Sequence, residues 1–330
     1  MSTGEVILSV KDLKVHFPVK GGGLFSGPRA LKAVDGVTFD VHAGETLGIV
    51  GESGSGKSTI GRAVLQLIKS TGGRIVWLGQ DIAGLSRKAM KPRRREMQIV
   101  FQDPLASLNP RMTAGDIIAE PLTTFEPDLS AADRKARVQD IMAKVGLLPQ
   151  MINRYPHEFS GGQNQRIGIA RAMILKPKLI VADEPVSSLD VSIRAQIINL
   201  LADLQKDTGV AFIFISHDLA VVRHVSHRVM VLYLGKVMEL AEGRELLDHP
   251  RHPYTQALLS AAPVPDPSVE AGKKRIVLEG DLPSPINPPS GCVFRTRCPI
   301  AQAKCAKEVP ALESRGGDAG HVVACHFPST

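Results

Sequence analysis

The feature that most constrains the fold is a short apolar run that ends in a glycine-rich loop. Residues 46–50 (Thr-Leu-Gly-Ile-Val) precede residues 51–59, Gly-Glu-Ser-Gly-Ser-Gly-Lys-Ser-Thr. The apolar run predicts a buried strand, and residues 57–67 predict a helix that begins where the glycines end. Glycine lets the backbone approach a phosphate, and loop amides with a helix N-terminus form an anion cradle. This strand–loop–helix order therefore predicts a nucleotide-phosphate site.

The loop matches the pattern G-x-x-x-x-G-K-[ST] over residues 51–58. In that pattern Lys57 would reach the β- and γ-phosphates, and the Ser58 hydroxyl would ligate Mg²⁺. The predicted nucleotide contacts are Gly51, Glu52, Ser53, Gly54, Ser55, Gly56, Lys57, Ser58 and Thr59.

A second signal is an apolar run that ends in two carboxylates, Leu-Ile-Val-Ala-Asp-Glu at residues 179–184. Asp183 is suited to hold Mg²⁺, and Glu184 is suited to accept a proton from an attacking water. Two adjacent carboxylates repel each other, so Mg²⁺ and Lys57 would neutralise them. This run therefore predicts the hydrolytic half of a nucleotide site.

A third signal is Phe-Ser-Gly-Gly-Gln at residues 159–163, just before an amphipathic helical pattern. Small residues at a helix N-terminus make a second anion site, formed here by Ser160, Gly161, Gly162 and Gln163. A second phosphate-binding end would be redundant within one subunit. If two subunits instead pack head to tail, each nucleotide lies between the loop of one and the Ser-Gly-Gly-Gln of the other.

Further apolar runs alternate with helical stretches. Strands are predicted at residues 6–17, 37–41, 179–182, 211–215 and 229–232, and residues 86–175 have a polar, helical pattern. Wholly apolar runs are typical of strands buried on both faces of a parallel sheet. The alternation predicts an α/β fold.

This combination of motifs resembles the ATP-binding subunits of ABC transporters over nearly the whole chain. The resemblance implies a P-loop NTPase core with an antiparallel β subdomain and a helical subdomain at about 93–172. It also implies ATP and Mg²⁺ as ligands and roles for four more residues. Gln102 matches the Q-loop glutamine, which senses Mg²⁺, water and the membrane partner. Asp190 belongs to the D-loop, His217 matches the switch histidine that contacts the γ-phosphate, and Phe17 lies where the family places an aromatic ring against adenine.

Composition fits a protein of this kind. The 330 residues are 43% hydrophobic and 22% charged, and no apolar run approaches the ~20 residues that span a bilayer. The N-terminus has no secretory signal pattern, so we expect the chain in the cytoplasm unless a partner brings it to a membrane. The net charge of +7 is scattered and aromatic residues are only 4%, which disfavours nucleic-acid binding.

Within the ABC proteins, the finer resemblance is to the F-type ATPase subunit of dipeptide and oligopeptide importers. The segments that carry it are residues 52–59, 102–104, 107–111, 154–159, 183–190, 249–259 and 282–285. It implies a heterodimer with a related ATPase, two permease subunits and an extracytoplasmic peptide-binding protein. It also implies peripheral attachment at the cytoplasmic face of the inner membrane. Nickel and glutathione importers are similar in sequence, so the cargo stays open.

Two alternatives belong to other classes. A soluble ABC ATPase acting on nucleic acid or ribosomes would carry a long coiled-coil insertion or two tandem ATPase units. This chain has one unit, with about a hundred residues and no heptads between the two phosphate motifs. A non-catalytic scaffold would not need Glu184 and His217. Two departures from the family pattern are Asn164, where a basic residue is usual, and Phe17, where tyrosine is common.

The chain changes character after residue 262, where prolines crowd a stretch without periodicity. We expect an ABC domain at 1–262 and a C-terminal accessory region at 263–330 that holds Cys292, Cys298, Cys305 and Cys325. In a cytoplasmic chain four cysteines argue against structural disulfides. Zinc is disfavoured by the lack of a C-x₂-C pair, and buried free thiols are a further alternative. The family resemblance implies a [4Fe–4S] cluster, for which four thiolates are the required ligands.

Overall fold

The computed structural model describes residues 4–19, 29–262, 272, 274–314 and 320–329. The chain forms two compact units. The first comprises residues 1–42, 46–84 and 216–330, and the second comprises residues 43–45 and 85–215.

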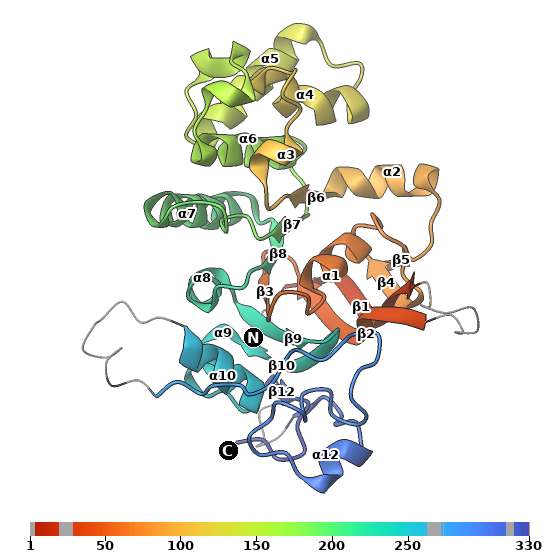
Figure 1. Ribbon diagram of the computed structural model, residues 1–330. Helices are drawn as coiled ribbons and strands as arrows, with labels where there is room; N and C mark the ends of the chain where they lie inside the picture. The colour runs from red at the N-terminus through yellow and green to blue at the C-terminus, as the bar shows by residue number, and fades with distance from the viewer. Residues whose placement is uncertain (1–3, 20–28, 263–271, 273, 315–319, 330) are drawn as a thin grey trace. The chain divides into compact units, whose positions relative to one another are not determined.

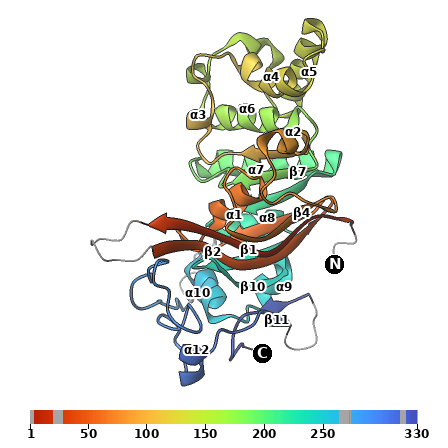
Figure 2. The same ribbon diagram turned by 90° about the vertical axis from the view of Figure 1, so that its right-hand side faces the viewer.

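The first unit contains an antiparallel sheet of four strands in the order β2-β1-β4-β5. These strands are β1 (Val6–Val19), β2 (Arg29–His42), β4 (Gly72–Trp77) and β5 (Gln80–Asp81). The two long strands β1 and β2 form a twisted ribbon (Figure 2), with Val10 opposite Phe39 and Val15 opposite Val34. These four side chains are buried, so the apolar alternation in β1 and β2 gives this sheet its core.

A second run of strands in the first unit has the order β11-β12-β10-β9-β3. Its members are β3 (Thr46–Val50), β9 (Arg228–Tyr233), β10 (Lys236–Glu242), β11 (Glu313–Ser314) and β12 (Val322–Val323). β3 pairs with β9 in parallel and is wholly buried, as its unbroken apolar sequence predicts. The helices of this unit are α1 (Lys57–Val64), α8 (Leu219–Val225), α9 (Gly243–Asp248), α10 (Pro253–Ala261) and α12 (Ala303–Lys307).

The second unit has three parallel strands in the order β8-β7-β6 and a helical part (Figure 1). The strands are β6 (Met97–Val100), β7 (Leu179–Asp183) and β8 (Ala211–Ile215). The helices are α2 (Arg87–Glu96), α3 (Pro104–Ser107), α4 (Ala114–Phe125), α5 (Ala131–Lys144), α6 (Gly161–Met173), α7 (Val191–Thr208), η1 (Pro149–Asn153) and η2 (Pro156–Glu158). In the part of the chain that the structure describes, no helix has both the length and the apolar character needed to span a bilayer.

Most of the predicted elements are confirmed, and the differences have local causes. The strand at 211–215 has the predicted bounds, whereas the strand predicted at 37–41 begins much earlier, at Arg29. The helix predicted at 57–67 ends at Val64, because Gln66 takes a left-handed φ of 52° and donates its side-chain amide to the Ala63 carbonyl. The strand β6 lies within residues 86–175, which were predicted as helical. It was not predicted, because its four residues are too few to show a period.

Near the C-terminus, a buried carboxylate ties β10 to later parts of the chain. Glu239 is fully buried and accepts hydrogen bonds from the backbone N–H groups of Arg251 (2.7 Å) and His252 (3.1 Å). Its Oε1 atom also lies 2.6 Å from Nε2 of the fully buried His321. A buried carboxylate is tolerated only when it is satisfied in this way, so these contacts fix the C-terminal segment onto β10.

His252 forms the N-cap of α10 from a fully buried position. Its Nδ1 accepts the N–H of Tyr254 at 3.0 Å, so that nitrogen must keep its lone pair. Burial lowers the pKa of His252 to about 4, against the opposing effect of Glu239. Between pH 6.5 and 4 the unfolded chain therefore binds a proton that the folded chain does not, and folding stability falls as the pH falls through that window.

We predict that His252→Asn weakens this acid sensitivity, because asparagine can cap a helix but does not titrate. Going from pH 7.5 to pH 5, the wild-type chain should lose about 2 kcal/mol of unfolding free energy more than the variant. Urea unfolding at the two pH values measures the difference. The exposed His249 supplies the control, since His249→Asn should keep the full wild-type decrease. Equal decreases in wild type and His252→Asn would contradict the assignment.

Candidate functional site

The glycine-rich loop joins β3 to α1, and its backbone takes conformations that suit glycine. Gly51, Gly54 and Gly56 have φ values of 152°, 79° and 105°. A Cβ atom would lie 2.1 Å from the Leu232 carbonyl oxygen at Gly51 and 2.2 Å from the Ala33 carbonyl oxygen at Gly56. Both neighbours are backbone atoms, so the loop cannot take this path with a larger residue at either position.

Lys57 bridges the loop from the first turn of α1. Its Nζ donates to the carbonyls of Gly51 (2.8 Å) and Glu52 (3.0 Å), and the side chain is only 5% exposed. The loop is also fixed at Ser55, whose N–H donates to the Glu52 carbonyl and whose carbonyl accepts the N–H of Gly235. Ser58 and Thr59 follow Lys57 in the same helical turn, and Ser53 lies in the loop itself. These protein bonds therefore hold the loop in the curved path that an anion cradle needs.

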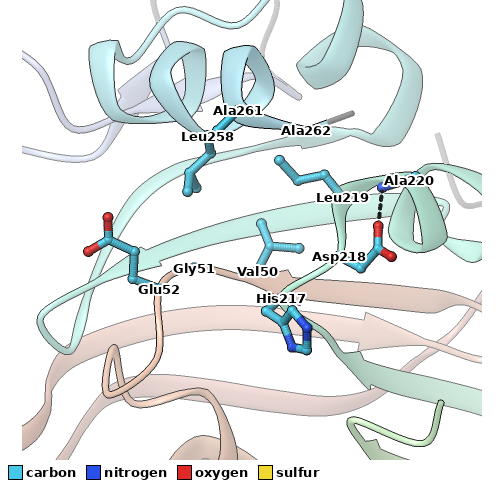
Figure 3. Close-up of a pocket in the computed structure, with 10 residues that line it drawn as sticks. All are labelled: Val50, Gly51, Glu52, His217, Asp218, Leu219, Ala220, Leu258, Ala261 and Ala262. Atoms are coloured by element: carbon cyan, nitrogen blue, oxygen red, sulfur yellow. Dashed lines mark hydrogen bonds between the residues drawn. The ribbon is translucent and has the colours of Figure 1, made fainter. Parts of the chain in front are cut away.

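His217 follows β8 and lines the same pocket as the beginning of the loop (Figure 3). The pocket has a volume of about 640 Å³. Its lining residues are Val50, Gly51, Glu52, His217, Asp218, Leu219, Ala220, Leu258, Ala261 and Ala262. Figure 3 shows the side chains of Val50, Leu219 and Leu258 facing one another, with the His217 ring at the edge. The predicted switch histidine and the phosphate loop thus belong to one surface of the first unit.

Phe17 lies near the end of β1, opposite Leu31 of β2. Its side chain is 40% exposed, which is unusual for a large aromatic ring in this chain. The ring is therefore accessible for stacking.

In the second unit, Glu184 stands directly after β7 with a strained backbone. Its φ is 48°, a left-handed value that is uncommon for a residue with a side chain. The backbone is held there because the N–H donates to the Ile215 carbonyl at 3.0 Å and the Ser187 hydroxyl donates to the Glu184 carbonyl at 3.1 Å. Such strain, of order 1–3 kcal/mol, persists where surrounding contacts fix it and clusters at functional sites.

The structure brings Gln102 and Glu184 together, as the shared site requires. The Gln102 Nε2 atom donates to the Glu184 Oε2 atom at 3.2 Å. Asp183, the last residue of β7, is 3% exposed and precedes Glu184 directly. Amide and carboxylate oxygens are the ligands that Mg²⁺ prefers, so these three side chains have the right chemistry for it.

The Ser-Gly-Gly-Gln segment forms the start of α6. Ser160 is the N-cap, its hydroxyl accepts the N–H of Gln163, and the Gln163 side chain accepts the N–H of Ser160. This capping box leaves the amides of the first turn directed at the helix end. Gly162 is required by packing, since a Cβ there would lie 2.4 Å from Ile193 of α7. Gly161 has more room, with its nearest neighbour, Leu189, 3.7 Å away.

Asn164, which departs from the family pattern, is buried rather than displayed on the surface. It is 1% exposed, and its Nδ2 donates to the carbonyls of Pro156 (3.0 Å) and Phe159 (3.3 Å). The side chain therefore holds the turn that leads into Ser160. At this position the chain carries no positive charge and has two buried hydrogen bonds.

Asp190 acts as the N-cap of α7. Its carboxylate accepts the N–H of Ile193 and the hydroxyl of Ser192, both at 2.9 Å, and these bonds hold its pKa below the usual value. Sequence analysis predicted a nucleotide contact for Asp190, and within this chain its carboxylate oxygen is used to begin a helix.

The four cysteines lie in one neighbourhood of the first unit. Burial, with smaller contributions from the nearby Cys305, Cys325 and Cys298, raises the pKa of the Cys292 thiol to about 11. The Cys292 N–H also donates to the Cys305 carbonyl at 2.8 Å. Even so, among the described residues no three histidine, cysteine or carboxylate groups are arranged to hold a metal ion. The predicted [4Fe–4S] or zinc site is therefore not supported by the geometry.

Sequence reasoning missed two residues that contact the loop from far away in the chain. The Tyr254 hydroxyl accepts the N–H of Glu52 at 2.9 Å, and Arg297 donates to the Glu52 carboxylate at 2.7 Å. Tyr254 lies in a segment that carried the family resemblance, but no spacing or periodicity connects either residue with position 52.

Two family profiles match the chain. The profile "ABC transporter" matches residues 34–187, and the profile "Oligopeptide/dipeptide transporter, C-terminal region" matches residues 238–305. The oligopeptide transport ATP-binding protein OppF of Salmonella typhimurium is 59% identical over 323 residues, which cover 97% of this chain and 96% of the relative. The chain belongs to the ABC transporter ATP-binding proteins.

Further relatives and solved structures agree with this family. The oligopeptide transport ATP-binding protein AppF of Bacillus subtilis is 54% identical and covers 98% of both chains. The dimeric structure of a post-hydrolysis ATP-binding cassette with bound ADP and phosphate matches with a TM-score of 0.64 and 28% identity. It covers 72% of this chain and 99% of that structure. The expected ABC ATPase fold is confirmed.

We predict that Asn164→Ala destabilises the chain by about 1–3 kcal/mol, because it removes a buried donor from the Phe159 carbonyl and one of the two donors from the Pro156 carbonyl. Urea unfolding measures the loss, and faster amide exchange at residues 156–163 should accompany it. Asn153 is exposed in η1, so Asn153→Ala serves as the control and should stay within about 0.5 kcal/mol of wild type. Unchanged stability and exchange in Asn164→Ala would contradict the role.

Proposed function

We propose that this chain is the ATP-hydrolysing subunit of an importer that takes up dipeptides or oligopeptides across the cytoplasmic membrane. The observation that carries the proposal is the 54–59% sequence identity with oligopeptide transport ATP-binding proteins over nearly the full length of the chain. The match to the oligopeptide/dipeptide transporter C-terminal profile supports it further. The ordered phosphate loop and the Gln102–Glu184 pair supply the chemistry that such a motor needs.

In this proposal each site residue has a defined task. Lys57 and the loop amides bind the β- and γ-phosphates of ATP, and Phe17 stacks against the adenine. The Mg²⁺ ion would be held by Ser58, Gln102 and Asp183, and would supply positive charge beside the phosphates.

The hydrolytic step depends on three side chains. Glu184 takes a proton from the attacking water, Gln102 orients the Glu184 carboxylate through their hydrogen bond, and His217 contacts the γ-phosphate. The strained backbone at Glu184 fixes where that carboxylate points.

The assembly is proposed from the two phosphate-binding ends of the chain. The nucleotide site of a related ATPase subunit would be completed by Ser160, Gly161, Gly162, Gln163 and Asp190 of this chain. The related subunit would in turn complete the nucleotide site of this chain. The heterodimer would attach to two permease subunits at the cytoplasmic face of the inner membrane, supplied by an extracytoplasmic peptide-binding protein. The division into an ABC domain at 1–262 and an accessory region at 263–330 belongs to the same proposal.

The cysteine neighbourhood supports a further proposal, that the C-terminal region holds a [4Fe–4S] cluster. Its support is that four thiols, the donor set such a cluster uses, lie in one neighbourhood of the C-terminal region. Zinc and free thiols are the alternatives.

We predict that Glu184→Gln lowers ATP turnover roughly 10²-fold or more, because it removes the general base. MgATP binding should survive, since Lys57 and the loop are unchanged. Single-turnover hydrolysis and equilibrium binding on the assembled complex separate the two effects. Turnover close to wild type in Glu184→Gln would refute the assigned role.

The wild-type chain and the Glu184→Gln variant also test which cargo the importer carries. Cells that lack this subunit should regain uptake of a labelled tripeptide with the wild-type chain and not with Glu184→Gln. If the wild-type chain restored uptake of nickel or glutathione instead of peptide, the proposed ATPase role would stand and the proposed peptide substrate would be wrong.

For the cluster, we predict about four iron and four acid-labile sulfide atoms per chain after anaerobic purification. Each of the four Cys→Ser variants should lose the iron. Zinc in place of iron, or a chain without metal, would contradict the cluster and select the corresponding alternative.

A further inference from the structure

Glu52, the second residue of the phosphate loop, is held at three points. Its N–H donates to the Tyr254 hydroxyl (2.9 Å), its carbonyl accepts from Lys57 (3.0 Å), and its carboxylate accepts from Arg297 Nη1 (2.7 Å). Arg297 lies 245 residues further along the chain, in the cysteine-containing segment. The C-terminal region therefore contacts the nucleotide loop directly.

The Arg297–Glu52 pair is largely withdrawn from solvent. The Arg297 side chain is 11% exposed and the Glu52 side chain is 28% exposed. Water screens such a pair less than an ion pair between fully exposed side chains, and removing Arg297 leaves the half-buried Glu52 carboxylate uncompensated. The pair is thus able to influence the charge at the loop.

An aromatic cluster holds Arg297 in place. The Arg297 N–H donates to the carbonyl of Phe294, whose fully buried ring meets Tyr233 edge-on at 5.2 Å and Tyr254 at 5.3 Å. Tyr233 and Tyr254 also contact each other, with their centroids 4.8 Å apart. Tyr254 bonds to Glu52 itself, so the cluster supports both members of the ion pair.

The charge of Glu52 needs a partner because of where it lies. The loop is built to receive phosphate groups, and an unneutralised carboxylate at its second residue repels them. Arg297 removes that repulsion without occupying the cradle, which Lys57 spans separately.

We propose that Arg297 is a positioning residue for the nucleotide site. Its bond to Glu52 neutralises the Glu52 carboxylate and anchors the phosphate loop. The C-terminal region therefore sets the affinity of the site for nucleotide. This inference rests on the proposed function as an ATPase and adds a residue outside the ABC motifs to it.

The test is MgADP binding to the full chain, measured by calorimetry, because it needs no hydrolysis. Arg297→Met keeps the apolar stem and should weaken binding roughly tenfold. In the double variant Glu52→Gln/Arg297→Met the repelling carboxylate is gone, so affinity should return to near the wild-type value. In the assembled complex Arg297→Met should raise KM for ATP and leave kcat nearly unchanged.

Arg295→Met provides the matched control. Arg295 lies two residues earlier in the same segment and donates to the carbonyl of Ser290, so its loss should leave MgADP affinity unchanged. If Arg297→Met does not fold, Arg297→Lys replaces it, with a smaller loss of affinity that Glu52→Gln also removes.

Wild-type affinity in Arg297→Met, or a loss that Glu52→Gln does not recover, would overturn the inference. Either result would leave the proposed function intact. Conversely, the variants could show the predicted MgADP affinities while peptides fail to stimulate ATP hydrolysis by the complex. That result would support the inference and reject the proposed function.

Discussion

The path of the phosphate loop is set by its close approach to the backbone carbonyls of neighbouring strands. A Cβ atom at Gly51 or Gly56 would lie within about 2 Å of the carbonyl oxygen of Leu232 or Ala33. Because those carbonyls belong to β9 and β2, the sheets of the first unit fix the path of the loop. Lys57 can then span the loop from the first turn of α1, through its bonds to the Gly51 and Glu52 carbonyls.

In the second unit, the end of β7 is held by a different device, which is local strain fixed by hydrogen bonds. Glu184 keeps a left-handed backbone because its own N–H and carbonyl are both bonded, and its carboxylate accepts a bond from Gln102. The start of α6 is prepared in a similar way, since the capping box at Ser160 and the buried amide of Asn164 fix the turn around it. Preorganised dipoles and charges of this kind are what phosphoryl transfer requires of a protein.

Sequence reasoning found the features that depend on local pattern and missed those that depend on distant contacts. The strand at 211–215 and the phosphate loop were predictable because buried strands are continuously apolar and the cradle requires glycine at fixed spacing. The strand β6 was not predictable, since four residues show no period. The Arg297–Glu52 pair could not be found either, because nothing in the sequence marks a contact across 245 residues.

Asn164 shows a further limit of sequence reasoning. If Asn164 lay on the surface, its only notable feature would be the missing positive charge. In the structure Asn164 is buried, and its side-chain amide donates to two carbonyls. Residue type alone does not distinguish these cases, and only the packing around α6 does.

The central claim is that this chain couples ATP hydrolysis to the import of peptides. The most direct measurement is the ATPase rate of the chain reconstituted in proteoliposomes with its partner ATPase and permease chains, as the binding protein is loaded with peptide. We expect hydrolysis to rise with di- or tripeptide on the binding protein and to stay low with the empty binding protein. A rate that no peptide changes, with stimulation by nickel or glutathione or by no cargo at all, would contradict it.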